Sequence, residues 1–328
     1  MRPVRRAGRA RAAVLLLGLG LLGCRGGPSE PRAPAAAGPS EGLTRDQGAI
    51  VRGDPASRRM SLVFTGGSFA DGGEHIRRVL RDEGVKAGFF FTGDFYRTPE
   101  FAGTIRGLVE DGHYMGPHSD RHLLYCDWND REKTLVGREE FRADILANFR
   151  EMERFGVARE KGHLFIPPYE WHNRDIAEWS EELDLVLFNF TPGTSSNADY
   201  TTPSMPEYLD SRTIYDRILA YEKKDPAGLN GFILLIHIGT DPARTDKFYV
   251  LLGDLVRELK KRKYELVRID KLLRPAGAEK AEAIYPGFPL EAAMGVASKI
   301  PVRGGGNPRS GGNRTTGSRG AGELEAIP

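Results

Sequence analysis

Residues 231–238 read Gly-Phe-Ile-Leu-Leu-Ile-His-Ile, an apolar run with one histidine near its end. Two further runs, at residues 60–65 and 86–92, are also mostly apolar. Short apolar runs without polar alternation are typical of strands that are buried on both faces. They predict a parallel sheet that is covered by helices.

Amphipathic segments separate these runs. The clearest covers residues 138–155, where apolar side chains recur at intervals of three and four residues at Phe141, Ile145, Phe149 and Met152. Helices are also predicted over 75–83, 101–111, 174–183, 211–222 and 247–261, and further strands over 113–116, 164–166, 184–190 and 265–269. This alternation predicts an α/β fold, and about seven such units favour a closed or nearly closed (β/α) barrel.

The first 23 residues are typical of an export signal. Several arginines precede an apolar run at 12–22, which is too short to span a bilayer. The run ends in Leu21-Leu22-Gly23-Cys24, which resembles the bacterial lipobox. We therefore expect a lipoprotein of the bacterial cell envelope that is held at the membrane by lipid on Cys24. An ordinary signal peptide with a chance cysteine is the alternative.

Composition divides the rest of the chain. Residues 24–50 are rich in Gly, Pro, Ala and Ser and predict a flexible tether, and residues 276–328 predict a disordered Gly/Arg-rich tail. One domain over 51–275 remains, which we expect to be monomeric. With Cys24 acylated, Cys126 has no disulfide partner, because the chain has only two cysteines. The net charge of +2 is spread along the chain and gives no case for nucleic-acid binding.

Three histidines lie where such a fold carries its chemistry, after the predicted strands. His118 and His122 are four residues apart, so on a helical turn both imidazoles would face one metal ion. Two surface histidines are the alternative. His237 ends the apolar run of residues 232–236 and is either a general acid or a histidine of the core.

Residues 165–171 read Phe-Ile-Pro-Pro-Tyr-Glu-Trp. The two prolines restrict the backbone. The segment is either a turn that ends a strand or a rigid wall of a site, with the backbone N–H of Tyr169 free to bind an oxyanion.

Taken in order, four motifs resemble the polysaccharide deacetylase (NodB-homology) family over residues 60–272. They are Lys-Ala-Gly-Phe-Phe at 86–90, His-Ser-x-x-His at 118–122, Pro-Pro-Tyr at 167–169 and Leu-x-His at 235–237. The resemblance implies a distorted (β/α) barrel, a divalent metal of the Zn²⁺ type, and hydrolysis of N- or O-linked acetyl groups on a polysaccharide. It implies these residue roles: metal ligands at His118 and His122, catalytic acid at His237, oxyanion binding at Tyr169 after Pro168, and tuning of the acid histidine by Asp199.

The sequence departs from the family pattern at the first strand. The paired aspartates of the family fall on Thr65 and Gly66, so the usual base and one metal ligand would be missing. The arginine that precedes Pro-Pro-Tyr in the family is Ile166 here. It is physically consistent that the aspartates and the arginine are absent together, because one charge of a buried ion pair left without its partner would destabilise the fold.

A shifted alignment recovers one carboxylate. Residues 68–72 read Ser-Phe-Ala-Asp-Gly, which makes Asp71 a candidate third metal ligand, with a helix N-cap as the alternative. The candidates for a substitute base are Asp94, Asp127, Glu170 and Asp241, with Glu170 as the first choice.

The main hypothesis is a lipid-anchored, metal-dependent polysaccharide deacetylase. The residues expected to contact the sugar are Pro168, Tyr125, Trp128, Trp171 and Tyr200. The alternative is a non-catalytic glycan-binding lipoprotein that kept the barrel and lost the base. A third hypothesis is another amide or ester hydrolase on the same fold.

Overall fold

The structure, a computed structural model, describes residues 42–274. The predicted signal peptide, the lipidated Cys24 and the predicted tail at 276–328 lie outside the described residues. Within the described part, no helix is both long and apolar enough to cross a membrane.

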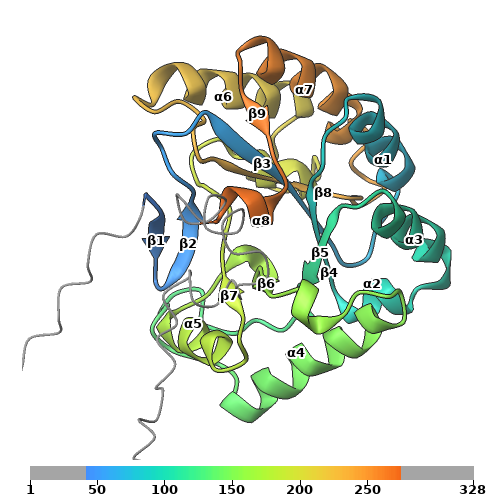
Figure 1. The fold of residues 1–328 in the computed structure, drawn as a ribbon, viewed down its shortest axis with the longest axis vertical. Coiled ribbons are helices and arrows are strands. Elements are labelled where there is room, and N and C mark those ends of the chain that lie inside the picture. The colour runs from blue at the N-terminus through green and yellow to red at the C-terminus, as the bar shows by residue number, and fades with distance from the viewer. Residues whose placement is uncertain (1–41, 275–328) are drawn as a thin grey trace, which may run out of the picture. The chain divides into compact units, whose positions relative to one another are not determined.

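Strands and helices alternate along the chain (Figure 1). The strands are β1 (Thr44–Asp46), β2 (Ala49–Arg52), β3 (Arg59–Gly66), β4 (Gly88–Phe91), β5 (Tyr114–Pro117), β6 (Leu164–Phe165), β7 (Val186–Leu187), β8 (Ile233–His237) and β9 (Glu265–Leu266). The helices are α1 (Gly73–Asp82), α2 (Gly93–Arg97), α3 (Ala102–Glu110), α4 (Arg138–Glu153), α5 (Arg174–Glu181), α6 (Ser211–Lys224), α7 (Leu252–Lys261) and α8 (Ile269–Leu272). Each predicted helix and strand has a counterpart, but the strands predicted over 184–190 and 265–269 are only two residues long, as β7 and β9. The helices α2 and α8 and the hairpin β1–β2 were not predicted.

A parallel sheet in the order β5-β4-β3-β8 forms the centre, and β9 also pairs with β3 in parallel. Thr65 of β3 lies opposite His237 of β8, and Gly66 lies opposite Phe91 of β4. The carboxyl ends of these strands therefore meet at one edge of the sheet, which confirms the predicted parallel α/β architecture.

Hydrogen bonds do not close the described strands into one barrel. The parallel pair β6–β7 is a separate sheet. Between β5 and β6 the connection runs through a side chain, because the N–H of Leu164 donates to the hydroxyl of Tyr114 at 2.7 Å. Pro117 is the last residue of β5, and Pro167 follows β6 by two residues; neither has the N–H that a ladder requires. The predicted barrel of about seven strands is therefore not confirmed.

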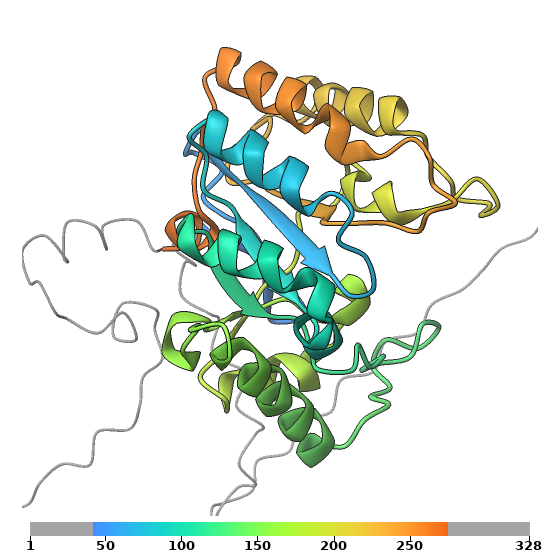
Figure 2. The same ribbon diagram turned by 90° about the vertical axis from the view of Figure 1, so that its right-hand side faces the viewer.

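Alternation along β3 builds a hydrophobic layer on each face of the sheet. Leu62 and Phe64 pack in the larger cluster, together with apolar residues of the helices such as Ile76. Val63 faces the opposite side and packs with Leu235 of β8 in a second cluster. Figure 2 shows α1, α3, α4 and α7 outside the strands, on the side of the first cluster.

The hairpin β1–β2 extends the domain toward the N-terminus. Gln47 and Gly48 connect its strands with φ values of 44° and 89°, the left-handed backbone of a two-residue hairpin turn. Ala49 and Ile50 are buried, and Ile50 forms a parallel bridge to Phe188. The domain thus begins before residue 51, and the end of the predicted tether belongs to the fold.

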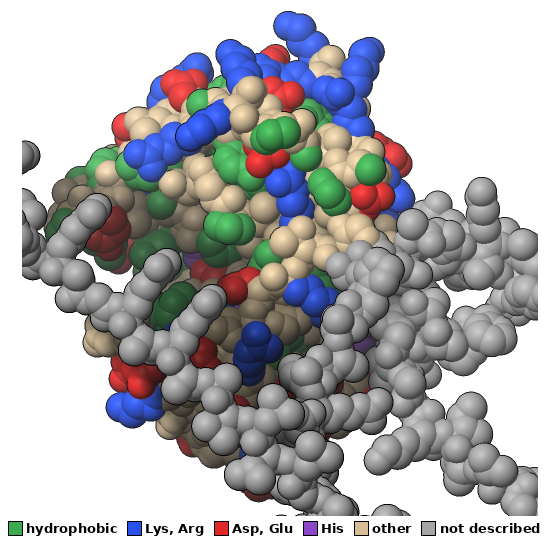
Figure 3. All heavy atoms as spheres, turned by 90° about the vertical axis from the view of Figure 1, so that its left-hand side faces the viewer, with side chains coloured by type: hydrophobic (Ala, Val, Ile, Leu, Met, Phe, Trp, Pro, Cys, Tyr) green, Lys and Arg blue, Asp and Glu red, His purple; other side chains and the backbone are tan. Residues whose placement is uncertain are grey.

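Charged side chains of both signs lie on the face of the domain that Figure 3 shows. In Figure 3, Lys and Arg side chains gather toward the top of the view, the end of the domain formed by α6 and α7, with acidic side chains among them. This mixture agrees with the small net charge of the chain.

Candidate active site

His118 and His122 lie in the loop that follows β5, with ring centroids 5.1 Å apart. The loop is not the helical turn that their spacing predicted. Ser119 and His122 have φ values of 72° and 54°, and this left-handed backbone turns the second imidazole toward the first. The predicted proximity of the pair is confirmed, and the predicted helical conformation is wrong.

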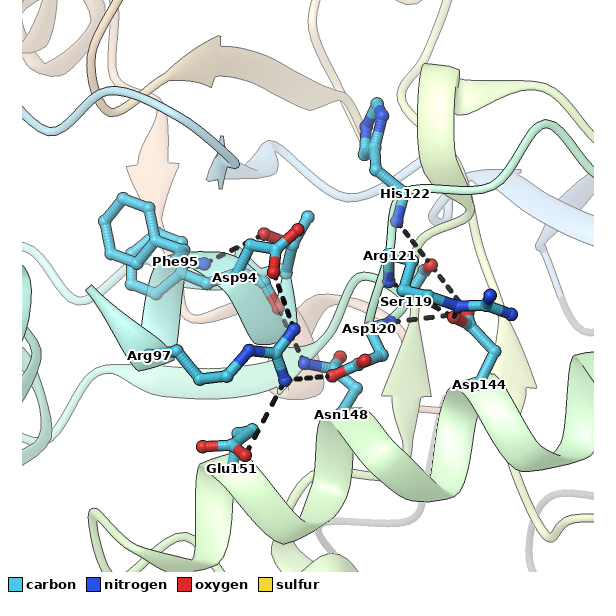
Figure 4. A network of polar contacts seen from close by, with 12 residues as sticks. Asp94, Phe95, Arg97, Ser119, Asp120, Arg121, His122, Asp144, Asn148 and Glu151 are labelled. Atoms are coloured by element: carbon cyan, nitrogen blue, oxygen red, sulfur yellow. Dashed lines mark hydrogen bonds and ion pairs between the residues drawn. The ribbon is translucent and has the colours of Figure 1, made fainter.

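A buried carboxylate on α4 shapes this loop. Asp144 accepts hydrogen bonds from the Ser119 hydroxyl at 2.6 Å and the Arg121 N–H at 3.1 Å (Figure 4). It also accepts one from the Tyr125 hydroxyl at 2.8 Å. The hydroxyl oxygen of Ser119 in turn accepts the N–H of His122 at 2.9 Å. Asp144 therefore holds the loop in a conformation that isolated residues rarely adopt.

One helical turn along α4, Asn148 completes this support. Its side chain accepts the N–H of His118 at 2.8 Å and donates to the carbonyl of Phe91 at 3.1 Å. Neither α4 residue was predicted from the sequence as part of the site. The available signal was their spacing of four residues on the helix face that also carries the buried Ile145 and Phe149.

Both imidazoles are in the form that can coordinate a metal. His118 Nδ1 lies 2.9 Å from the carbonyl of Ile166, which places its proton on Nδ1 and leaves Nε2 as an acceptor. Burial, and then the charge of His122, hold the pKa of His118 well below its usual value. Burial, and then the charge of His237, lower the pKa of His122 to about 4.

The described residues do not complete a catalytic zinc site of the usual kind. Such sites use three protein ligands. No group of three or more His, Cys, Asp or Glu side chains among residues 42–274 is arranged to hold a metal ion. His118 and His122 would thus provide two ligands without a third from residues 42–274.

Asp71, the predicted third ligand, is engaged elsewhere. Its carboxylate lies 3.0 Å from the ammonium of Lys247 and accepts hydrogen bonds from the Tyr249 hydroxyl and the Thr240 N–H at 3.0 and 2.9 Å. It does not cap a helix either, since the N-cap of α1 is Gly72 without a side-chain bond. Neither interpretation of Asp71 is supported, because its charge is already paired with Lys247.

His237 and Asp199 form a tight pair at the end of β8. Asp199 lies in a short 3₁₀ helix, Ser196–Tyr200, and is 1% exposed. Its carboxylate accepts the backbone N–H of His237 at 2.9 Å and lies 2.7 Å from Nδ1 of the ring. Burial lowers the pKa of His237, but the charge and hydrogen bond of Asp199 outweigh it, so the net shift is upward. The predicted partnership of the two residues is present.

Glu170 lies in the same region, in the 3₁₀ helix Pro168–Glu170. Tyr169 and Glu170 have φ values of 59° and 53°, a strained backbone for residues with side chains. Burial raises the pKa of Glu170 to about 7, although the charge of His237 opposes the shift. Glu170 is therefore close enough to His237 for their charges to interact.

The other candidate bases have local roles. Asp94 pairs with Arg97 at 2.7 Å, and Asp127 pairs with Lys133 at 3.5 Å. Asp241 accepts the N–H of Ala243 at 2.7 Å within its own loop. Glu170 remains the one of the four whose electrostatic contacts are with the histidine and aspartate of the site.

Aromatic side chains surround these groups. Trp128 is 55% exposed, and its ring centroid lies 5.8 Å from that of Trp171 and 5.5 Å from that of Tyr169. The ring centroids of Tyr200 and His237 are 5.4 Å apart. These rings are available for a sugar to stack on. Two of the residues predicted to contact the sugar are not accessible to it. Tyr125 is fully buried and its hydroxyl donates to Asp144, and Pro168 is also buried.

Residues 52–188 match the family model of the polysaccharide deacetylases. This segment carries the sequence pattern of the polysaccharide deacetylases in a divergent form. It is also 24% identical over 127 residues to an uncharacterized 30.6 kDa protein of Geobacillus stearothermophilus, a match that covers 38% of this chain and 43% of that protein.

Solved structures share the fold of this chain. A CE4 family pseudoenzyme from Bacillus anthracis is 19% identical, with a TM-score of 0.54 over 70% of each chain. PdaA from Bacillus subtilis, a family 4 carbohydrate esterase, is 18% identical, with a TM-score of 0.52 over 69% of this chain and 85% of that one.

The domain has no room for a carboxylate at the second of the two aligned aspartate positions. A Cβ atom on Gly66 would lie 2.7 Å from Ile238 and 2.9 Å from Phe91. At the first position, Thr65 is 1% exposed and its buried hydroxyl has no hydrogen-bond partner within the described part of the chain. Apolar packing has therefore taken the space at this strand end.

Proposed function

We propose that the domain removes acetyl groups from a polysaccharide, with Glu170 as general base and His237 as general acid. The observation that carries this proposal is the Asp199–His237 pair, whose ring contact is 2.7 Å long. A buried aspartate on Nδ1 orients the ring and keeps it protonated, as an acid catalyst requires. Glu170 supports the proposal because a carboxyl with a pKa of about 7 can accept a proton near neutrality.

The reaction needs two proton transfers. Glu170 takes a proton from water while the water oxygen attacks the acetyl carbonyl carbon. The backbone N–H of Tyr169 binds the oxyanion of the tetrahedral intermediate. When the bond from the carbonyl carbon to the sugar nitrogen or oxygen breaks, His237 protonates the departing amine or alcohol, which leaves acetate and the deacetylated sugar.

None of these steps passes through a metal. Dependence on a divalent metal, with Zn²⁺ as the first candidate, remains a prediction that rests on the two neutral imidazoles of His118 and His122. A metal bound there would polarise the acetyl carbonyl.

We also propose that the protein acts at the bacterial cell envelope, anchored by lipid on Cys24. The support is the order of a basic segment, an apolar run and Leu-Leu-Gly-Cys at residues 21–24. The polysaccharide substrate would then be a glycan of the envelope or one that reaches it.

A second candidate function is non-catalytic glycan binding. It is favoured by the apolar packing around Gly66 and by the missing third metal ligand. The exposed rings of Trp128, Tyr169 and Tyr200 would serve binding alone equally well.

Acetate release separates the two candidates. The purified protein is incubated with N-acetylated and O-acetylated glycans, and acetate is measured for the wild type and for Glu170→Gln. We expect release by the wild type and a loss of at least about 100-fold in the variant, the size of a general-base contribution. Glycan binding without release by the wild type would establish the non-catalytic function, and an unchanged rate in Glu170→Gln would exclude Glu170 as the base.

A further inference from the structure

Arg244 is a buried cation outside the motifs discussed so far. It lies in the loop after β8 and is 0% exposed. Burying a guanidinium is costly unless its N–H groups find acceptors, so its contacts indicate its role.

The N–H groups of Arg244 bind three segments of the chain. Nη1 donates to the carbonyl of Thr201 at 2.8 Å, Nη2 to the hydroxyl of Ser211 at 3.0 Å, and Nε to the carbonyl of Asp246 at 3.0 Å. The carboxylate of Asp246 lies 3.7 Å from Nε and balances the charge. Arg244 thus connects the segment after Asp199, the start of α6 and its own loop.

The segment that carries Asp199 depends on such contacts. Between β7 and α6, the only helix or strand described is the 3₁₀ helix Ser196–Tyr200. Long connections of this kind need tertiary contacts to hold one conformation. Thr201 directly follows the 3₁₀ helix, and its hydroxyl donates back to the carbonyl of Ala198 at 2.7 Å. Fixing the Thr201 carbonyl therefore fixes the turn in which Asp199 lies.

We propose that Arg244 is a positioning residue that holds Asp199 against His237. Arg244 follows His237 in the chain, so it ties the loop of the acid histidine to the loop of its aspartate. The planar fork of arginine can bind acceptors on separate segments at once, which the ammonium of lysine cannot reproduce. The predicted effect on catalysis rests on the proposed function, but the predicted effect on the Asp199–His237 pair does not.

The test compares Arg244→Met and Arg244→Lys with the wild type. The titration of the His237 imidazole is followed by NMR, together with acetate release. We expect the pKa of His237 to fall by at least about one unit as the Asp199 contact loosens. We expect kcat to fall by about 10- to 100-fold with KM little changed, because displacement of a catalytic group by about 1 Å has effects of this size.

The sign of the NMR result is diagnostic. Removing a positive charge from the neighbourhood would by itself raise the pKa of a histidine. A fall in Arg244→Met therefore reports loss of Asp199 rather than loss of the arginine charge. The other titratable groups whose charges act on the His237 region, Glu170, His118 and His122, are unchanged in both variants.

Arg52 provides a matched control at the opposite end of β8. It also bonds two carbonyls, those of Asn230 at 2.8 Å and Gly228 at 2.9 Å, and it pairs with Asp225 at 3.4 Å. Arg52→Met should lower stability and leave the titration of His237 unchanged.

An unchanged or raised pKa of His237 in folded Arg244 variants would overturn the proposal. So would unfolding of both Arg244 variants while Arg52→Met folds, since Arg244 would then serve overall stability. If the wild type releases no acetate, the proposed function fails, and the NMR comparison still decides the role of Arg244.

Discussion

The hydroxyl of Ser119 donates to Asp144 at 2.6 Å, and its oxygen accepts the N–H of His122 at 2.9 Å. Through this hydroxyl, a buried carboxylate on α4 controls the backbone of the second histidine of the pair. The position of the His118–His122 pair thus depends on a residue that follows it by more than twenty places in the sequence.

Replacing Asp144 by Asn should destabilise the domain by about 2–3 kcal/mol, because an amide group would replace an oxygen that accepts buried donors. Urea unfolding measures the change, and NMR of the His118 and His122 rings should show altered shifts. Glu140→Gln is the control on the same helix, since Glu140 is 48% exposed and 3.5 Å from Arg121. That variant should change stability by less than about 0.5 kcal/mol. Equal effects of the two substitutions would contradict the role of Asp144.

Substitutions at Gly66 and Gly67 test whether apolar packing leaves room for a side chain at the end of β3. A Cβ on Gly66 would meet Ile238 at 2.7 Å, whereas a Cβ on Gly67 would meet only Thr92, at 3.8 Å. Gly66→Ala should therefore cost about 1–3 kcal/mol of stability through overpacking. Gly67→Ala should stay within about 0.5 kcal/mol of the wild type. Urea unfolding of both variants is the measurement, and a neutral Gly66→Ala would show that the strand end can open to admit a carboxylate.

Metal binding should depend on His118 and not on Asp71. Co²⁺ titration of the purified protein, followed by visible absorption, tests both residues. His118→Ala removes one of two imidazoles and should abolish the binding that the wild type shows. Asp71→Asn should leave the affinity for Co²⁺ unchanged, because Asp71 pairs with Lys247 at 3.0 Å. A large loss of affinity in Asp71→Asn would show that the loop rearranges to bring this carboxylate to the metal.

Activity should have a bell-shaped dependence on pH. The base Glu170 must be ionised, so kcat/KM should rise as the pH increases through about 7. The acid His237 must be protonated, so kcat/KM should fall again as the pH increases through its pKa, which Asp199 raises above the usual value. The macroscopic values belong to the interacting pair.

Rates of acetate release at constant ionic strength give this profile, and two variants assign its limbs. Asp199→Asn should move the alkaline limb to lower pH, since the charge that raises the pKa of His237 is gone. Glu170→Gln should remove the acidic limb together with most of the rate. A profile whose acidic limb persists in Glu170→Gln would assign that limb to another group.

Much of the fold follows from the sequence. Apolar runs such as 231–238 bury both faces of a strand wherever they lie, so they predicted a parallel sheet with helices on it. The closure of the barrel could not be predicted from the same runs. It depends on whether edge strands find hydrogen-bond partners, and the prolines at the end of β5 and just after β6, Pro117 and Pro167, have no N–H to donate.

For the site, the order of motifs predicted His118, His122 and His237 as candidate residues, together with the absence of carboxylates at residues 65 and 66. A motif fixes which residue types follow one another, and this is independent of how the chain packs. Only the tertiary structure decided that Asp71 pairs with Lys247, that Tyr125 is buried on Asp144, and that Arg244 contacts the loop of Asp199. These are long-range contacts set by how loops and helices pack, and packing distances are not encoded in local spacing. The sequence by itself thus determined which chemical groups stand at the strand ends, and the tertiary structure decided which of them meet.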